Sequence, residues 1–594
     1  MKKTLMRFAA AALSLALLAP CVGATETQEK EGVTIRVGLA SSSTHNSLGE
    51  LVGANLWNNT GYGSGYRFGY YNENLQFVEV ARTDETVEQV SVIKTQNTWC
   101  INGGRDTYSN SDNGGIAVGC YHILLEECAD YETAAASAEA YSGFVAWING
   151  NYQVRYGAYL SKEEAVAEVE SMGQGEVVGT SSYGMNVVAT GTDRILFQYD
   201  NGEGSVLGIL PDVTGAEDVR TWFWDIKYRG GFTYQRIGGG NLTVVNVLDL
   251  EDYIKGVAPY EMGRSWPLEA LKTQATCART YALGRLNHHK SLGFDVCNSD
   301  NCQVYYGVGS KSTTWGPTEV SDQAVDETAG QVIWYKDELA LTLYSSSHGG
   351  ASEDIVNVWT WNKPGAYPYL CGVEDPYEAE VSSINAKSDW AVTYTKKELT
   401  KQLQSKGFGR NTSVDELELE YSELGNVIKL VVYWTNGQKN TFKPSDGSNS
   451  IRSVFGVDSI RFTVNGETAN AAASSTASKS FSINGEGKHT ALDGYFVISG
   501  DGTVAALDVS KNVYVITGDG DVDALLEQDV SAGTNQGGGT VTVSASTYKF
   551  EGGGWGHQMG MSQYGAYAMS QLGFDFEEIC EFYYPGTEVG PYQP

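Results

Sequence analysis

A glycine-rich stretch near the C-terminus, residues 551–566, carries side chains that could contact a polar ligand. It reads Glu-Gly-Gly-Gly-Trp-Gly-His-Gln-Met-Gly-Met-Ser-Gln-Tyr-Gly-Ala, with six glycines in sixteen residues. Glycine is entropically costly wherever another residue would fit, so this stretch indicates that something must approach bare backbone. The side chains between the glycines offer aromatic rings, an imidazole and hydrogen-bonding groups, which suits a polar ligand lying against the main chain. The alternative is a glycine-rich turn before the helix-like run from Tyr564 to Leu572.

A second candidate is Glu261, a carboxylate in the loop before a well-marked helix. Ser265 is a suitable N-cap for that helix and Pro267 suits its first turn. The positive end of a helix would hold the carboxylate ionised, unless apolar neighbours withdraw it from water and raise its pKa. The apolar face predicted for the helix consists of Leu268, Leu271, Ala275 and Ala278.

Other acids compete with Glu261 as the source of acid–base chemistry. Glu251 and Asp252 are interpreted as polar groups of a loop, and Glu269 as part of the solvated face of the helix.

Cysteine and histidine residues downstream of the helix form a third candidate site. Cys297 and Cys302 are separated by four residues, and His288 and His289 lie eight or nine residues before the first of them. Two thiolates and one imidazole satisfy the ligand chemistry of zinc and would leave a position for water or substrate. A disulfide that closes a small loop is the alternative in an exported protein.

The chain of 594 residues is long enough for three or four domains, and 70 glycines and 36 tyrosines favour strands and turns over long helices. Its N-terminus has a basic start, a short apolar run and a small-residue cleavage site, so we expect a signal peptide over residues 1–24 and an exported protein. Cys21 follows a lipoprotein-like sequence, but the proline directly before it disfavours acylation. No later segment is expected to cross a membrane.

Charge excludes one class of partner. Removal of the signal peptide leaves 37 basic residues against 72 acidic ones, a formal charge of 37 − 72 = −35. Nucleic acid is a poor partner for such a chain, because binding to phosphate backbones depends on clustered Lys and Arg. A neutral polymer fits better.

The N-terminal half predicts two kinds of unit. Residues 25–116 contain short alternating runs typical of a β-rich region. Residues 117–178 predict the order β-α-β-β-α, with Ser161 opening the second helix through a capping box. The run from Tyr152 to Tyr159, followed by Ser161-Lys-Glu-Glu-Ala, resembles a SPOR domain, which implies binding to peptidoglycan glycan stripped of its stem peptides. Tyr156 and Tyr159 are candidates for sugar stacking.

Four sequence blocks in the second half together resemble the stage II sporulation protein D family (SpoIID/LytB). They are Glu261-Met with the helix through Arg279-Thr-Tyr-Ala, the segment from Cys297 to Tyr305, Ser347-His-Gly-Gly with Pro368-Tyr369-Leu370, and the segment from Gly554 to Ala566. The resemblance covers roughly residues 220–462 and 545–594.

The resemblance implies a lytic transglycosylase that cleaves peptidoglycan glycan, with Glu261 as general acid and base and Arg279 as its helper or as a grip on the glycan. It also favours a zinc site at Cys297, Cys302 and His289, with His288 still an alternative ligand. The substrate-binding residues it implies are Tyr369, His557, Ser562, Gln563, Tyr564 and Tyr584.

Three positions depart from the family pattern. Gly263 stands where the family usually has proline, and Gln558 stands where it has glycine, which puts a side chain at a point of expected close approach. His348 adds an imidazole near the expected cleft, and an exposed loop histidine is the alternative.

The expected fold class is therefore α+β and multidomain, β-rich with a short helical catalytic segment and a small βαββα SPOR-like domain. The SpoIID/LytB domain would span residues 180–462 and 548–594, interrupted by a linker and small β insertion over 463–547. The expected protein binds and cleaves peptidoglycan glycan in the wall of a Gram-positive bacterium, during wall remodelling or sporulation. The alternatives are a non-catalytic enhancer of a cell-wall amidase and a glycan-binding wall protein.

Overall fold

The computed structural model describes residues 32–593 except 44–45, 59–64, 102–107, 113, 213–218, 311–315, 446 and 469–537, with only short backbone strands assigned between 481 and 526. The expected signal peptide and most of the 463–547 insertion lie outside the described residues. The described part contains no helix long and apolar enough to cross a membrane. Its fold is β-rich α+β, as the composition predicts.

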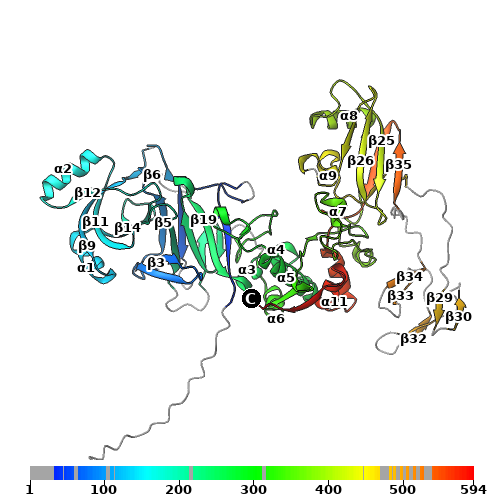
Figure 1. Ribbon diagram of the computed structural model, residues 1–594, viewed down its shortest axis with the longest axis horizontal. Helices are drawn as coiled ribbons and strands as arrows, with labels where there is room; N and C mark the ends of the chain where they lie inside the picture. Colours follow the sequence, from blue (N-terminus) through cyan, green and yellow to red (C-terminus); the bar gives the residue numbers. More distant parts are fainter. Residues whose placement is uncertain are drawn as a thin grey trace, which may run out of the picture.

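Two sheets pack face to face in the N-terminal half (Figure 1). The ten-stranded sheet consists of β12 (Glu176–Val178), β9 (Tyr121–Cys128), β11 (Asn151–Tyr159), β10 (Phe144–Ile148), β14 (Ile195–Asp200), β13 (Met185–Ala189), β5 (Gln89–Lys94), β2 (Gly53–Asn58), β16 (Thr221–Phe223) and β17 (Ile226–Tyr228). The seven-stranded sheet consists of β20 (Val296–Cys297), β1 (Thr34–Ala40), β19 (Thr243–Asp249), β18 (Gly231–Gln235), β15 (Val206–Pro211), β3 (Tyr66–Tyr71) and β4 (Phe77–Arg82). A small third sheet consists of β7 (Tyr108–Ser109), β6 (Thr98–Cys100) and β8 (Ile116–Val118).

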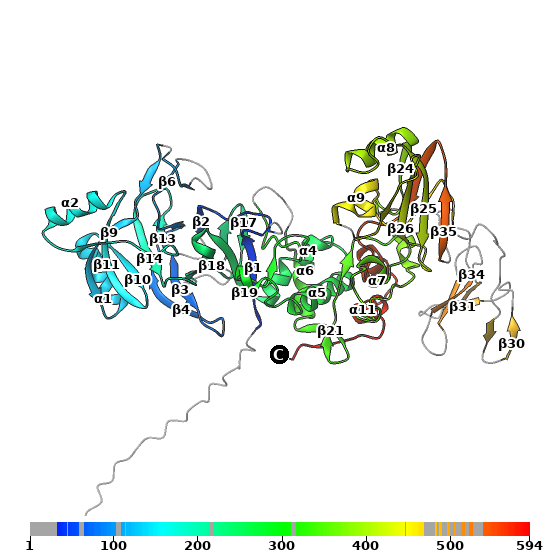
Figure 2. The ribbon, with the colours of Figure 1, turned by 45° about the horizontal axis from the view of Figure 1, so that its top comes forward.

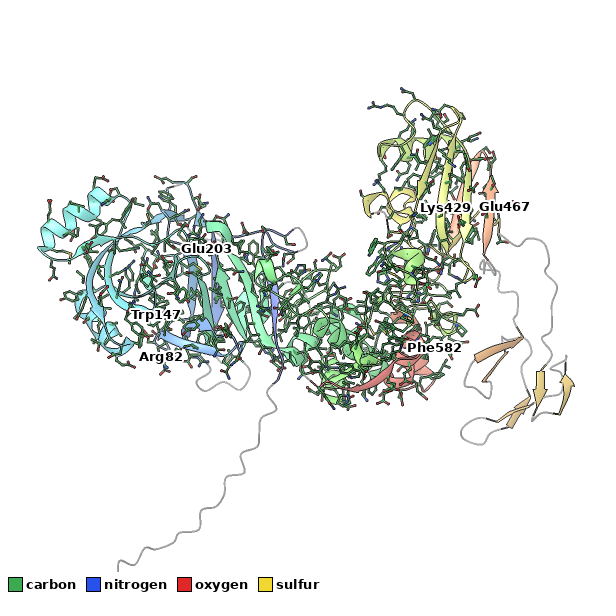
Figure 3. The ribbon with its side chains drawn as sticks, in the orientation of Figure 1. Arg82, Trp147, Glu203, Lys429, Glu467 and Phe582 are labelled. Atoms are coloured by element: carbon green, nitrogen blue, oxygen red, sulfur yellow. The ribbon has the colours of Figure 1, made fainter. Side chains whose placement is uncertain are left out.

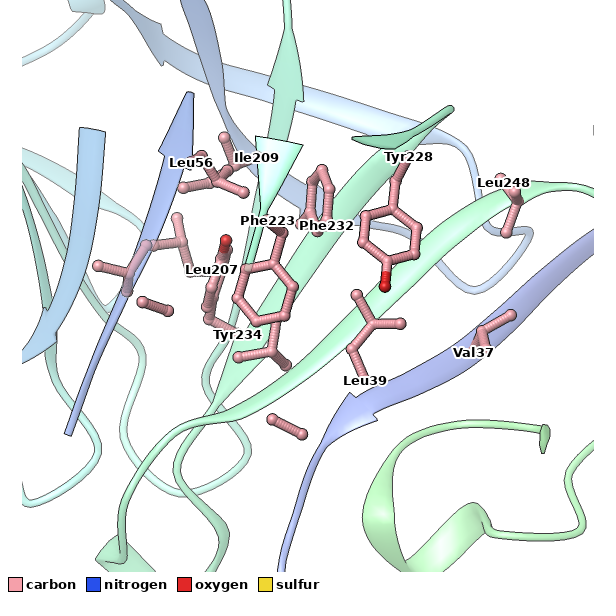
Figure 4. Packing of buried hydrophobic residues seen from close by; sticks show 14 of the residues in the cluster. Val37, Leu39, Leu56, Leu207, Ile209, Phe223, Tyr228, Phe232, Tyr234 and Leu248 are labelled. Carbon is pink, nitrogen blue, oxygen red and sulfur yellow. The ribbon is translucent and has the colours of Figure 1, made fainter. Parts of the chain in front are cut away.

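The core between the two large sheets follows from period-two alternation. Ile35, Val37 and Leu39 of β1 are all fully buried, because alternate side chains of a strand point to the same face. Figure 4 shows Leu56 of β2 beside Ile209 of β15, where the two sheets meet. The alternating runs noted in the sequence therefore become β1, β4 and β5.

The segment with the SPOR-like sequence has the predicted element order. β9, α1 (Tyr131–Tyr141), β10, β11 and α2 (Lys162–Met172) follow one another, and Ser161 caps α2 in a capping box with Glu164. The segment is not a separate body, however. β10 pairs in parallel with β14, so the segment continues the same ten-stranded sheet.

Short helices form the middle of the molecule (Figure 2). They are α3 (Leu250–Lys255), α4 (Ala258–Glu261), α5 (Leu268–Leu283) and α6 (Glu319–Glu327). The predicted helix is present as α5 but begins at Leu268, later than expected. Pro267 occupies the N-cap instead of the first turn and no side chain caps the helix, so the predictions for Ser265 and Pro267 were wrong. Polar residues of α5 such as Gln274 and Arg279 are buried as well as the apolar face, because α5 is packed on several sides.

The C-terminal segment completes the part that contains these helices. β37 (Met561–Ser562) pairs in parallel with β23 (Tyr344–Ser345). α10 (Gln563–Gln571) and α11 (Phe576–Tyr583) pack on α5. β38 (Glu588–Pro591) pairs with β21 (Gln331–Tyr335), next to β22 (Glu338–Leu339).

A lobe built from residues 390–464 and 539–552 lies beside this part, as Figure 3 shows with Phe582 of α11 below and Lys429 and Glu467 above. Its sheets are β24 (Trp390–Thr395), β36 (Thr547–Gly552) and β28 (Phe462–Val464), and β27 (Lys439–Phe442), β26 (Val427–Trp434), β25 (Val414–Tyr421) and β35 (Gly539–Val543). Its helices are α8 (Lys396–Ser405) and α9 (Ile451–Phe455). The chain thus leaves the lobe through β28 and re-enters it through β35 and β36.

Candidate functional site

Glu261 is the last residue of the short helix α4 and lies at a partly buried position. Its Oε1 accepts a hydrogen bond of 2.7 Å from the backbone N–H of Val304. Burial raises the pKa of Glu261 to about 7, against the lowering effect of hydrogen bonds from Val304 and from the Tyr344 side chain. The negative charge of exposed Asp300 raises this pKa further. A carboxyl group with such a pKa can both donate and accept a proton near neutral pH.

A chain of hydrogen-bonded side chains leads to Glu261 from the core. Buried Tyr253 donates to Gln303 Oε1 at 3.0 Å, and Gln303 Nε2 donates to the Tyr344 hydroxyl at 3.1 Å. Tyr344 in turn hydrogen-bonds to Glu261. The sequence did not point to Tyr344, which stands 83 residues after Glu261 and only one residue before the Ser345–Gly350 segment.

His289, Cys297 and Cys302 come together as the sequence predicted. Their ligand atoms all lie within 4.8 Å of one another, and His289 Nε2 is 3.4 Å from Cys302 Sγ. His288 is exposed and is not part of this group. Cys297 and Cys302 are both free thiols in the structure and do not form the disulfide that was the alternative to a metal site.

The cysteine-bearing segment also positions Glu261. Gln303 and Val304 directly follow Cys302, and both belong to the hydrogen-bond network around the Glu261 carboxyl. A contact that restrains Cys302 would therefore also restrain the backbone N–H of Val304, which hydrogen-bonds to Glu261.

Arg279 lies away from Glu261, in the packing between helices. It is 0% exposed, and its guanidinium makes a two-pronged ion pair with Glu251, with contacts of 2.8 and 2.6 Å. A further N–H donates to the carbonyl of Gln331 at 3.0 Å. Arg279 therefore ties α3 and α5 to β21 instead of gripping a glycan or orienting Glu261, and Glu251 is a structural partner instead of a competing acid.

The glycines of residues 551–566 serve the protein's own backbone. Gly560 has φ +68°, and a Cβ there would lie 2.1 Å from the carbonyl oxygen of Leu343. A Cβ at Gly556 would lie 2.4 Å from that of Ser345. The segment 343–349 thus occupies the place that the sequence analysis gave to a ligand, and the expectation of a ligand against these glycines is corrected.

Gln558 fits this arrangement despite its departure from the family pattern. Its side chain is fully buried, accepts from Ile460 N at 2.8 Å and donates to the carbonyl of His348 at 2.8 Å. It therefore joins the glycine-rich segment to both of its neighbours. Gly263 has a local reason too, since a Cβ there would lie 2.2 Å from the indole nitrogen of Trp266.

Three of the predicted substrate-binding residues are structural. Ser562 is 0% exposed, caps α10 and donates to Glu378. The hydroxyl of buried Tyr584 donates to the carbonyl of Leu343 at 2.7 Å, and that of buried Tyr369 accepts from Leu341 N at 2.7 Å. A ligand cannot reach these groups, so their prediction as glycan contacts is corrected to a bracing role.

The remaining predicted residues differ in access. Gln563 is mostly buried and donates to Gln274 at 3.1 Å. Tyr564 is partly exposed and packs its ring against Trp266, with centroids 4.9 Å apart. His557 is also partly exposed and is the one that borders a cavity.

The cavity beside His557 was not anticipated from the sequence. It measures about 320 Å³ and is lined by Trp359, Arg452 and three serines, among other residues. Trp359 stacks on Trp361, whose side chain is 67% exposed. Flat exposed aromatic surface beside polar groups can bind a sugar ring on one face.

Residues 238–335 match the family described as stage II sporulation protein (SpoIID). That range contains Glu261, Arg279, His289, Cys297 and Cys302.

Individual relatives extend the match well beyond that range. An uncharacterized protein of Brachyspira hyodysenteriae is 30% identical over 353 residues, which cover 59% of this chain and 69% of the relative. The amidase enhancer of Bacillus subtilis is 30% identical over 346 residues, 57% of this chain and 40% of the relative, so the match spans less than half of that protein. Stage II sporulation protein D of Bacillus subtilis is 24% identical over 359 residues, 59% of this chain and 76% of the relative. With the four sequence blocks in order and Glu261 held beside the cysteine-bearing segment, the chain belongs to the stage II sporulation protein D family.

Proposed function

We propose that this protein is an exported lytic transglycosylase that cleaves glycan strands of peptidoglycan, with stem-peptide-stripped glycan as its preferred substrate. The observation that carries the proposal is Glu261, a partly buried carboxyl with a pKa of about 7 held by Val304 and Tyr344. Wall remodelling or sporulation is the setting that the family suggests.

The chemistry requires one carboxyl group that acts twice. Protonated Glu261 donates its proton to the glycosidic oxygen as the bond from that oxygen to the muramoyl C1 breaks. The C6 hydroxyl of the same sugar attacks C1, and the Glu261 carboxylate accepts the hydroxyl proton. The product is a 1,6-anhydro end and no water is consumed, whereas a hydrolase of the usual type needs a second carboxylate.

Substrate contacts are assigned to aromatic and polar side chains that are at least partly exposed. Tyr564 and Trp266 offer aromatic surface, and His557 with the Trp359–Trp361 stack offers a second contact region. The SPOR-like segment 117–178 would hold the same stripped glycan at a distance, through Tyr156 and Tyr159.

We also propose a zinc ion at His289, Cys297 and Cys302. Two thiolates and an imidazole with ligand atoms within 4.8 Å suit tetrahedral zinc, with a fourth position for water. Zinc bound there supplies a fixed cross-link between the three side chains. The two residues after Cys302 contact the active-site side chains directly: Gln303 hydrogen-bonds to Tyr344, and the backbone N–H of Val304 hydrogen-bonds to Glu261.

The experiment is a digestion of stem-stripped glycan with the mature protein and with Glu261→Gln, followed by mass spectrometry for anhydro-ended fragments. We expect such fragments from the wild type and a loss of at least about 100-fold in the variant. No product from the wild type, or equal product from both, contradicts the assignment.

A non-catalytic amidase enhancer is the second candidate, because one relative carries that name. The two functions separate when a cell-wall amidase is added to the same digestion. If the protein stimulates stem-peptide release equally with and without Glu261→Gln, and produces no anhydro ends, the enhancer function holds.

A further inference from the structure

A second group of potential metal ligands lies away from the cysteines, beneath the glycine-rich segment. His348, Asp375 and Glu378 place one ligand atom each within 4.8 Å of the others, and all three are buried. His348 follows β23, whereas Asp375 lies just before the short helix η3 (Tyr377–Val381) and Glu378 lies within it. This was the histidine for which an exposed loop was the alternative, and that alternative was wrong.

The His348 imidazole lacks any hydrogen-bond partner within the described structure. Its side chain is 0% exposed, and neither Nδ1 nor Nε2 is paired. An unpaired buried polar group destabilises a fold, and most such groups in folded proteins have a partner, so this imidazole points to a partner outside the protein chain. The chain's other fully buried described histidine, His122, contacts the carbonyl of Gly157 at 2.7 Å and Gln198 at 2.9 Å.

The two carboxylates are held in place by hydrogen-bond donors of the surrounding protein. Asp375 Oδ2 accepts from the Tyr583 hydroxyl at 2.6 Å. Glu378 accepts from the backbone N–H groups of His348 and Gly349, both at 2.6 Å, and from Ser562. Such outer contacts are what orient metal ligands in known sites. Glu378 Oε1 and Asp375 Oδ1 each accept two hydrogen bonds, whereas Glu378 Oε2 and Asp375 Oδ2 each accept one and keep a second lone pair.

Two buried carboxylates side by side call for a positive charge. Burial, together with the Asp375 charge, raises the pKa of Glu378 to about 7, and burial raises the pKa of Asp375 as well. Arg461 is a buried cation whose charge acts on both carboxylates, but its Nη1 donates to the carbonyl of Leu424 at 2.6 Å. Within the part of the chain that the structure describes, no hydrogen bond or ion pair joins Arg461 to either carboxylate.

We propose that His348, Asp375 and Glu378 bind a divalent transition-metal ion, at a site distinct from the cysteine site. One imidazole nitrogen and two carboxylate oxygens are ligands that zinc and its neighbours accept. The imidazole disfavours calcium and magnesium, which prefer oxygen-only sets. The metal joins β23, which carries Tyr344, to the Asp375–Glu378 turn and, through Ser562, to α10.

Metal content of the full mature protein tests the proposal. After dialysis against zinc and then buffer, we expect elemental analysis to find two zinc ions per chain. Cys302→Ser and His348→Gln should each lose one, and the matched control His122→Gln should lose none. If His348→Gln retains as much zinc as the wild type, the proposal is overturned. If His348→Gln alone loses zinc, this site stands and the cysteine site fails.

A measurement on the wild type guards against a variant that does not fold. Anomalous diffraction at the zinc edge should give a peak among His348, Asp375 and Glu378, besides any peak at the cysteines. Crystals soaked in zinc that show no density there overturn the proposal whatever the variants do.

Discussion

At the scale of single residues, the ionisation of Glu261 sets the pH range of the proposed reaction. Because the acid must be protonated to act, cleavage should be half-maximal near pH 7 and fall about tenfold per pH unit above it. Asp300→Asn removes a negative charge that raises this pKa, so the falling limb should move to lower pH while the maximal rate persists. A pH–rate profile of both proteins measures the shift. Complete loss of activity in Asp300→Asn would instead indicate a two-carboxylate hydrolase.

Tyr344 should tune Glu261 without taking part in proton transfer. Its hydrogen bond favours the charged form of Glu261 and lowers the pKa. In Tyr344→Phe we expect the falling limb to move to higher pH by roughly half to one unit, with activity retained at pH 6. The profile checks this, and an unchanged limb would mean that the contact has no energetic weight. Tyr335→Phe is the control, because Tyr335 is also partly buried but packs its ring against Tyr369.

The same carboxylate affects stability through its ionisation. Its pKa in the folded protein lies above the usual value of 4.5, so ionisation opposes folding as the pH rises from about 4.5 to 7. Glu261→Gln removes that penalty. Its unfolding midpoint should equal the wild type near pH 4 and exceed it above pH 7, as thermal scans at several pH values can show.

At the scale of elements, Gly560 permits the close passage of β37 beside residue 343. Gly560→Ala would combine an unfavourable positive φ with a Cβ 2.1 Å from the Leu343 oxygen, so we expect a loss of more than about 2 kcal/mol. Gly586 is a matched control because its φ is +78° and no atom lies near its missing Cβ. Gly586→Ala should cost only about 1 kcal/mol. Denaturant unfolding of both variants measures the difference, and equal losses would exclude the steric cause.

Arg279 should matter for stability and not for the chemical step. Arg279→Lys keeps the charge but cannot make the two-pronged pair with Glu251, so we expect a loss of about 2 kcal/mol or more. At a temperature where the variant is folded, its cleavage rate should stay within about twofold of the wild type. Exposed Arg410 gives the control Arg410→Lys, expected within about 0.5 kcal/mol. A folded Arg279→Lys variant with normal stability and no activity would return Arg279 to the catalytic site.

Local sequence patterns predicted several helices and strands, but contacts between distant chain segments determine the arrangement of the candidate site. Alternation predicted β1 and β5, and spacing predicted α5 and α2, because these signals lie within ten or so residues. The gathering of His289, Cys297 and Cys302 was expected from the family resemblance, because spacing alone left His288 and a disulfide as alternatives. The contact of Tyr344 with Glu261, the burial of His348 and the filling of the glycine-rich segment by residues 343–349 depend on chain segments far apart in sequence.

At the scale of the whole molecule, the sequence suggested boundaries that the sheets do not respect. Residues 25–116, 117–178 and 180–462 were expected as successive units, because composition and turn signals change between them. In the structure they share two sheets: β1 pairs with β19, β3 with β15, β5 with β13 and β10 with β14. Strand pairing between distant segments leaves no mark on local composition, so the sequence could not reveal it.

This interleaving predicts which fragments fold. Fragments 117–178 and 180–594 would each expose unpaired strand edges, along β10 in the first and along β13, β15 and β19 in the second, so we expect both to aggregate or to lack cooperative unfolding. Fragment 32–249 keeps every strand of both large sheets except β20 and should be soluble, with cooperative unfolding followed by circular dichroism. A soluble and cooperatively folded 117–178 would mean that the SPOR-like segment is an independent domain whose pairing with β14 adds little. In that case its glycan binding could be measured on the isolated segment, whereas otherwise it must be measured on the intact chain.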